Sequence, residues 1–124
     1  MNTRVNLFLY GTLKRKHYNY TRFGLHDPLN GKYVCDATAF DIGMSAEGGL
    51  PRAFRNKGTK VVGEVYEVNS LPLLATLIRM EYGADYEVMD IEVVTNDGPV
   101  TCLMFVTRRH LAGAAKDDKL IEDF

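Results

Sequence analysis

One carboxylate lies where a helix of this sequence would place its apolar side chains. Three apolar residues have the i, i+3 and i+4 spacing of one helix face: Leu74, Leu77 and Ile78. Glu81 takes the next position on that face, and Gly83 can end the helix. Burial and the negative end of the helix dipole both disfavour an ionised carboxyl group, which suits it to general acid–base catalysis. The alternative is a helix that frays before Glu81, so that its side chain faces solvent or pairs with Arg79 or Arg52.

A second feature that could take part in binding or catalysis is the turn that follows the first apolar run. Gly11 and Thr12 come directly after a predicted strand that ends in Tyr10. Glycine lets the backbone turn sharply, so that successive N–H groups can point into one concavity and bind a carboxylate or an oxyanion. Thr12 adds a hydroxyl donor, and Lys14 and Arg15 add positive potential if they point the same way. The alternative is a plain turn with solvated cations.

A second carboxylate, Glu64, lies within the predicted strand VVGEVYEV, residues 61–68. It shares one face of that strand with three other residues: Val62, Tyr66 and Val68. Either this face is buried and Glu64 is a buried acid, or the face with Val61 and Val65 points inward and Glu64 is in water. The strand pattern leaves both open.

Other catalytic and metal-binding patterns are absent from the sequence. The histidines, His17, His26 and His110, form no i, i+4 pair with a glutamate between them. The chain has no G-x-S-x-G elbow, P-loop or G-x-G-x-x-G motif. Cys35 and Cys102 are isolated within apolar stretches, so we expect buried reduced thiols and neither a zinc site nor a disulfide.

The composition is typical of one soluble globular domain, and we expect residues 1–124 to form it. The chain has 124 residues, of which 46% are hydrophobic and 25% charged. A net charge of −1 argues against a nucleic-acid partner held by counterion release. The N-terminal apolar run is short and interrupted by glycine, so we expect neither a signal peptide nor a membrane partner, and a cytoplasmic location.

Hydrophobic periodicity predicts mostly strands and one clear helix. The helix spans residues 71–80, with Ser70 as its N-cap. The glycine-rich residues 41–59 predict an irregular loop, and residues 107–124 a frayed helix or a tail. The predicted strands are residues 5–10, 33–40, 61–68, 86–95 and 100–106, with a hairpin turn before the last. This order favours a mixed α/β fold: a small closed or strongly curved β-barrel with flanking helices.

Several motifs, taken in order, resemble one known family. They are YGTLKR after an apolar strand, the G-x-P of residues 49–51, GEVYEV, and a helix that ends in a glutamate with a glycine and a tyrosine nearby. Together they resemble the γ-glutamylcyclotransferase-like family, which includes γ-glutamylamine cyclotransferases and plant avirulence-induced-gene-like proteins. The resemblance spans residues 5 to 106. It implies a small β-barrel with flanking helices and a central cavity.

The resemblance also implies a reaction and the residues for it. A γ-glutamyl amine or related conjugate would cyclise to 5-oxoproline and release its amine, with no cofactor or metal. Glu81 matches the catalytic glutamate, whereas Glu64 matches a position that we expect to be structural. The residues expected to contact the substrate are Tyr10, Gly11, Thr12, Leu13 and Tyr86.

The sequence departs from the family pattern around this expected pocket. Lys16 replaces a common glycine, Tyr82 separates Glu81 from Gly83, and Val88 replaces a common arginine. Arg52 stands where small residues are frequent, and either contacts a substrate carboxylate or is solvated. These departures bear on the substrate more than on the fold. A non-catalytic module that binds a small ligand or a protein is the alternative function.

Overall fold

The computed structural model describes residues 5–45, 52–83, 86–107 and 120–124, and only the backbone of residues 81–83. These residues form five strands, two α-helices and a short 3-10 helix, η1. In chain order the elements are β1 (Val5–Leu9), η1 (Gly11–Leu13), α1 (Tyr18–Arg22), β2 (Gly31–Ser45), β3 (Arg52–Val68), α2 (Leu71–Gly83), β4 (Tyr86–Thr95) and β5 (Gly98–Thr107). The order confirms the expected mixed fold, with a helix before the last hairpin.

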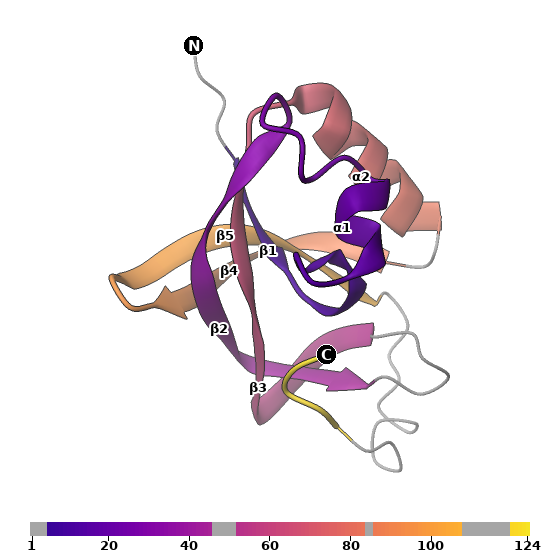
Figure 1. The fold of residues 1–124 in the computed structure, drawn as a ribbon. Helices are drawn as coiled ribbons and strands as arrows, with labels where there is room; N and C mark the ends of the chain where they lie inside the picture. The colour runs from indigo at the N-terminus through magenta and orange to yellow at the C-terminus, as the bar shows by residue number, and fades with distance from the viewer. Residues whose placement is uncertain (1–4, 46–51, 84–85, 108–119) are drawn as a thin grey trace.

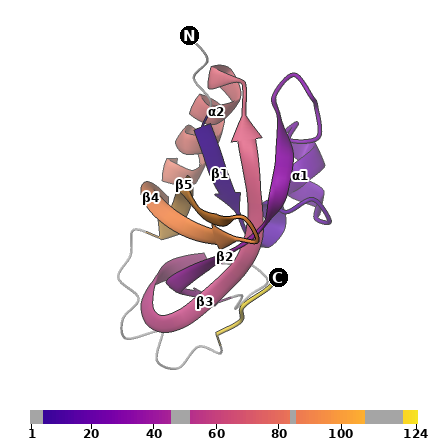
Figure 2. The same cartoon turned by 90° about the vertical axis from the view of Figure 1, so that its left-hand side faces the viewer.

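The strands close into a small barrel in the order β1-β3-β2-β4-β5. Neighbouring strands are antiparallel, except that β1 and β5 pair in parallel at Leu7 and Leu103. Both helices lie at one end of the molecule, and the bent far half of the β2–β3 pair forms the other end (Figure 1; Figure 2). The predicted closed or strongly curved barrel with flanking helices is therefore confirmed.

The prediction of an irregular loop over residues 41–59 is wrong for the part that the structure describes. β2 continues to Ser45 and β3 begins at Arg52, where the two residues pair. The pairing skips from Phe40↔Lys60 to Ile42↔Arg55, so residues 56–59 bulge out of the ladder. Gly58, with a φ of 89°, serves this bulge in a continuous strand. Glycines at a bend of a barrel were therefore mistaken for glycines of a loop.

Two apolar clusters lie on the two sides of the barrel wall. Alternation along β1 sends Phe8 to the interior cluster and Leu7 and Leu9 to the helix-side cluster. Buried interior residues come from all five strands and include Phe8, Ala39, Val61, Val93 and Met104. The central cavity implied by the resemblance stays a prediction.

Helix α2 covers the outer cluster with the stripe that the sequence predicts. Its start is capped by Ser70, whose Oγ accepts a hydrogen bond from the Leu73 amide at 3.2 Å. Leu74 and Leu77 are buried on the barrel side. The helix ends at Gly83, three residues beyond the predicted end, so the backbone of Glu81 lies in its last turn.

A glycine sets how closely β1 approaches β3. A Cβ atom built at Gly63 would lie 2.3 Å from the Leu9 carbonyl oxygen and 2.6 Å from the Phe8 ring. Real Cβ atoms do not approach backbone oxygens so closely, and these atoms belong to the strand that leads directly into η1. The absence of a side chain at residue 63 therefore permits the observed position of β1.

Candidate functional site

The turn after β1 is a single turn of 3-10 helix that begins with a glycine. Tyr10 is extended, whereas Gly11 has a φ of 61°, in the left-handed region that favours glycine. The Leu13 and Lys14 amides close the turn on the carbonyl oxygens of Tyr10 and Gly11, at 3.4 and 3.3 Å. Within the described part of the chain, no group accepts a hydrogen bond from the amides of Gly11 and Thr12. These two N–H groups can serve an external acceptor.

The side chains of this turn have different surroundings. Tyr10 is buried in the interior cluster, and its hydroxyl donates to the carbonyl oxygen of Phe105. Leu13 instead packs on the helix side. The Thr12 hydroxyl accepts a hydrogen bond from Asn19 Nδ2 at 2.8 Å, so it keeps its own proton as a donor. The turn thus presents backbone and hydroxyl donors, while its two large side chains anchor it.

Glu64 is a buried carboxylate that fixes the loop after this turn. Its residue is 7% exposed, and it accepts hydrogen bonds from the Arg15 amide at 2.9 Å and the Arg15 Nε at 3.2 Å. The next residue, Val65, faces the interior cluster, whereas Tyr66, which shares a strand face with Glu64, faces the helix side. Glu64 therefore points outward from the barrel and is covered by the loop. Each of the two alternatives is therefore correct in one respect. Glu64 is buried, but it is Val61 and Val65 that face the barrel interior.

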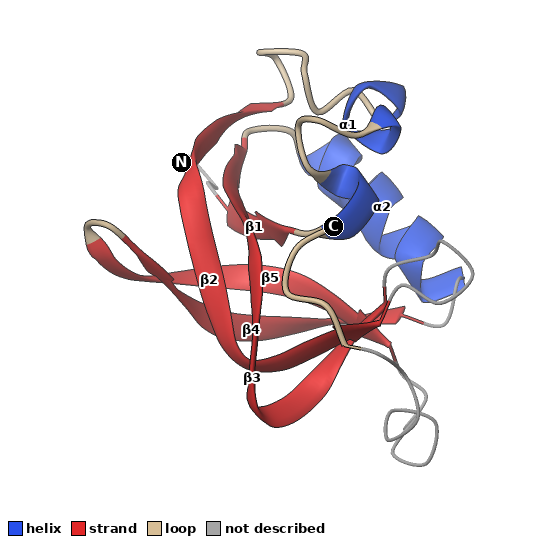
Figure 3. Ribbon diagram, turned by 60° about the horizontal axis from the view of Figure 1, so that its bottom comes forward, coloured by secondary structure: helices blue, strands red, loops and turns tan. Residues whose placement is uncertain are grey.

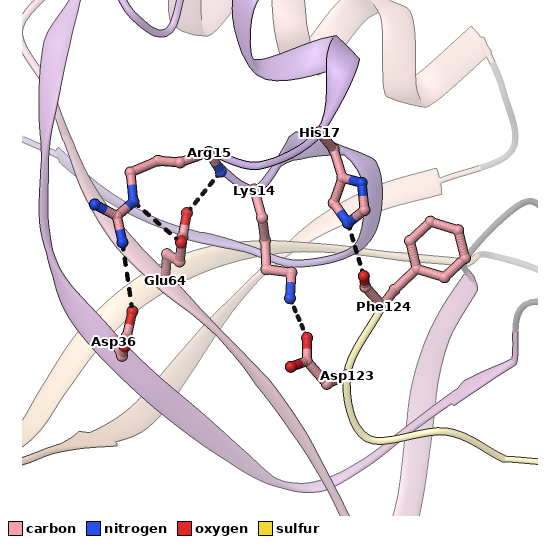
Figure 4. Close-up of polar contacts among 7 residues, drawn as sticks. All are labelled: Lys14, Arg15, His17, Asp36, Glu64, Asp123 and Phe124. Carbon is pink, nitrogen blue, oxygen red and sulfur yellow. Dashed lines mark hydrogen bonds and ion pairs between the residues drawn. The ribbon is translucent and has the colours of Figure 1, made fainter.

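Arg15 is held on three sides. Besides Glu64, it approaches Asp36 at 4.0 Å, and its guanidinium lies over the Tyr33 ring, 3.4 Å from the centroid. Figure 4 shows Arg15 reaching one way from the loop while Lys14 and His17 reach the other. Lys14 and Arg15 therefore bind different partners. They are not simply solvated, and they do not point in the same direction.

Lys14 and His17 contact residues from the far end of the sequence. The Lys14 ammonium is buried and forms an ion pair with the Asp123 carboxylate. This hydrogen bond holds the pKa of Asp123 below its ordinary value. The His17 Nε2 lies 2.7 Å from the main-chain oxygen of Phe124, and the two rings are 5.2 Å apart.

Residues 120–124 form a strap, by which name we refer to them below, that runs beside the loop and the bent ends of β2 and β3 (Figure 3). Leu120 bridges to Ser45 of β2. The Ile121 amide donates to Met44 at 2.8 Å, and the carbonyl of Glu122 accepts from the Val62 amide. Ile121 and Phe124 pack against the interior cluster. This docking was not predicted from the sequence, although the apolar residues in an otherwise polar end are its signal.

The remaining predicted site residues are placed in different ways. Tyr86, the first residue of β4, is half-buried and packs on the helix side, in the cluster that contains Leu13. Arg52 is exposed at the start of β3, opposite Ser45 and hence beside the strap. The side chain of Glu81 and the G-x-P of residues 49–51 lie outside what the structure describes. Their roles stay predictions.

Two further observations concern ligands and membranes. Among the described residues, no three side chains of histidine, cysteine, aspartate or glutamate gather where they could hold a metal ion. Of the helices that the structure describes, none has the length and apolar character to cross a membrane. Both cysteines in the described strands are free, with Cys102 buried and Cys35 half-buried.

Comparison with known proteins identifies the family. The model of the family described as gamma-glutamyl cyclotransferase, AIG2-like, matches residues 7–123. The chain belongs to this family, which confirms the resemblance seen in its motifs and supports a γ-glutamyl cyclotransferase type of function in general terms. No curated protein sequence matches significantly.

Solved structures share the fold. An AIG2-like protein from Mus musculus matches with a TM-score of 0.78 and 22% identity, over 98% of this chain and 88% of that one. The YtfP protein from Escherichia coli matches with a TM-score of 0.63 and 28% identity, over 96% and 93% of the two chains. A protein described as gamma-glutamyl cyclotransferase gives a TM-score of 0.63 and 24% identity, over 84% of this chain and 66% of that one.

Proposed function

We propose that this protein is an enzyme that cyclises a γ-glutamyl amine, or a related γ-glutamyl conjugate, to 5-oxoproline and releases the amine. The observation that carries the proposal is the turn at η1. Its Gly11 and Thr12 amides have no acceptor within the described part of the chain, and Glu64 fixes the loop that follows. Membership of the cyclotransferase family supports the same reaction.

The reaction needs few groups because the substrate carries its own nucleophile. The free α-amine attacks the γ-carbonyl carbon, a new C–N bond closes a five-membered ring, and the amide C–N bond breaks. The nucleophile and its target are in one molecule, so the protein contributes mainly by holding the folded conformation. The atoms balance without water or a second substrate.

One acid–base group suffices for the proton transfers. In the proposed mechanism, the Glu81 carboxylate removes a proton from the attacking nitrogen and returns it to the leaving nitrogen. The backbone of Glu81 lies in the last turn of α2. The amides of Gly11 and Thr12 and the Thr12 hydroxyl would hold the substrate carboxylate or the developing oxyanion. Tyr10, Leu13, Tyr86 and Arg52 are proposed to line the substrate site.

The proposal is tested with a panel of γ-glutamyl amines and γ-glutamyl peptides, by chromatographic detection of 5-oxoproline. We expect at least one compound to be converted. Glu81→Gln should reduce turnover by at least about 100-fold, the usual contribution of a general acid–base group. Glu87→Gln is the matched control because it removes the same charge from an exposed position on β4.

The outcomes separate the mechanism from the function. Full activity of Glu81→Gln would exclude the assigned base while leaving the reaction intact. Binding of panel compounds without conversion by the unmodified protein would favour the non-catalytic binding module. Circular dichroism spectra of both variants establish that any loss is not due to unfolding.

A further inference from the structure

Lys14 and its partner in the strap differ sharply in burial. The side chain of Lys14 is 6% exposed, whereas that of Asp123 is 51% exposed. A buried ammonium is costly unless a counter-charge is present, and within the described residues Asp123 is the one acid that pairs with it. Lys14 therefore has a strong requirement for a carboxylate, while the carboxylate it has is open to solvent.

His17 adds a second polar group to the same place. Its Nε2 meets the main-chain oxygen of Phe124, the residue after Asp123. The two side chains thus hold a carboxylate and a neighbouring main-chain oxygen on one short piece of chain (Figure 4). A small molecule with a carboxylate and a second oxygen acceptor nearby offers the same two kinds of partner.

The pair also lies directly beside the turn proposed to hold the substrate. Lys14 follows η1 without a break, and its amide closes that turn on the Gly11 carbonyl. Its ammonium and the N–H groups of Gly11 and Thr12 therefore belong to one short loop. A carboxylate bound to Lys14 would be held next to the turn.

The attachment of the strap is divided between two places. Residues 120–122 are held by backbone hydrogen bonds to the ends of β2 and to β3, while residues 123 and 124 are held through Lys14 and His17. Loss of the second set leaves the first as the remaining backbone attachment of the strap. Asp123 can therefore leave Lys14 while the backbone bonds at residues 120–122 still form, although these bonds then open more often.

We propose that Lys14 and His17 form a carboxylate-binding site, and that Asp123 occupies it as an internal ligand which small carboxylates must displace. That the substrate is one of these displacing carboxylates rests on the function proposed above, since a γ-glutamyl compound carries both a carboxylate and a carbonyl. The strap then acts as a competitive inhibitor built into the chain. It lowers the apparent affinity for acidic ligands by the fraction of molecules in which the site is filled.

The test measures binding without turnover. Glutarate is titrated into isotope-labelled protein, and the shifts of the Lys14 and His17 signals are followed by NMR, with uncharged glutaramide as the control ligand. Asp123→Asn should bind glutarate about tenfold more tightly than the unmodified protein, as expected if the strap fills the site in about nine of ten molecules. Glu122→Gln is the matched control, because it removes the same charge from the neighbouring exposed residue. Its affinity should be unchanged.

A second arm tests the site itself. Lys14→Met should lose glutarate binding, and His17→Gln should weaken it; the latter variant replaces the former if removal of the lysine prevents folding. Equal glutarate affinity in Asp123→Asn and Glu122→Gln would overturn the internal-ligand proposal, and retained binding in both site variants would overturn the site. Absence of 5-oxoproline formation would affect only the proposed function, because glutarate binding does not depend on turnover.

Discussion

Glu64 and Arg15 are joined by two hydrogen bonds, one to the backbone amide at 2.9 Å and one to the guanidinium Nε at 3.2 Å. The carboxylate comes from the rigid middle of β3, and the arginine from the loop that follows η1. One side chain thus fixes both the path of the main chain and the direction of a cation. The position of the proposed anion-binding turn depends on this contact.

Removal of the Glu64 carboxylate should therefore loosen the loop. Glu64→Ala leaves the Arg15 amide and Nε without their partner, and we expect the free energy of unfolding to fall by about 1–3 kcal/mol. The rise in KM for any γ-glutamyl substrate should exceed the fall in kcat, because substrate positioning is lost and the acid–base group is not. Urea unfolding and steady-state kinetics measure the two effects.

The control for this variant is Glu92→Ala, which removes an exposed glutamate from β4. Its stability should change by less than about 0.5 kcal/mol. If Glu64→Ala is as stable as this control and its Arg15 amide exchanges hydrogen no faster than in the unmodified protein, the positioning role is wrong.

Tyr66 gives a stability effect with a defined pH dependence. Its buried hydroxyl donates to the Leu25 carbonyl at 2.8 Å, and burial raises its pKa from 10.0 to about 12. Tyr66→Phe leaves that carbonyl without its donor and should cost about 1–2 kcal/mol at pH 8. The native state keeps the phenol proton longer than the unfolded state does. The contribution is therefore complete below pH 10 and is lost as the pH rises towards about 12.

Urea unfolding at pH 8 and at higher pH checks this expectation. The difference between the unmodified protein and Tyr66→Phe should shrink as the pH rises above 10.0. Tyr18→Phe serves as the control because Tyr18 is 74% exposed, and it should behave like the unmodified protein throughout. A difference that stays constant with pH would contradict the raised pKa.

Asp123 predicts how the strap responds to acid. The Lys14 hydrogen bond holds the pKa of Asp123 below 3.8, so the folded protein keeps this carboxylate ionised where the unfolded chain would protonate it. The ion pair contributes fully above pH 3.8 and is lost as the pH falls through the lowered value. Lys16 adds to the attraction, but it is exposed and screened by salt.

Hydrogen exchange of the Ile121 amide reports this loss, because that amide bonds to Met44 within the strap. Opening of the strap, after correction for the intrinsic pH dependence of exchange, should increase below pH 3.8 in the unmodified protein and in Glu122→Gln. Asp123→Asn should show more frequent opening at neutral pH and no further increase in acid. An identical acid response in Asp123→Asn would show that another group controls the strap.

The elements that the sequence predicted well are those fixed by local patterns. The Ser70 cap, the stripe of Leu74 and Leu77, and the hairpin turn before β5 each depend on neighbouring residues, and each is observed. The bend in β2 and β3 was missed because a glycine in a bulge and a glycine in a loop look alike in sequence. Only the pairing partner distinguishes them, and that partner is more than ten residues away.

The backbone turn of the candidate site could be predicted from the sequence, but the partners of its charged side chains could not. A glycine after an apolar strand indicated the turn at Gly11, whose φ of 61° fits. The partners of Lys14 and Arg15 lie 109 and 49 residues away, and no local pattern encodes such pairs. Whether a charged side chain is solvated or buried was therefore decided by tertiary packing.

The close packing of β1 against Gly63 fixes the position of the turn within narrow limits. Leu9 and Phe8 rest against the place where a side chain would stand, and Tyr10 follows at once. Even one methyl group there would displace the strand and carry the two donor amides with it. The position of the two donor amides thus depends on a hydrogen atom at residue 63, which takes no part in the proposed chemistry.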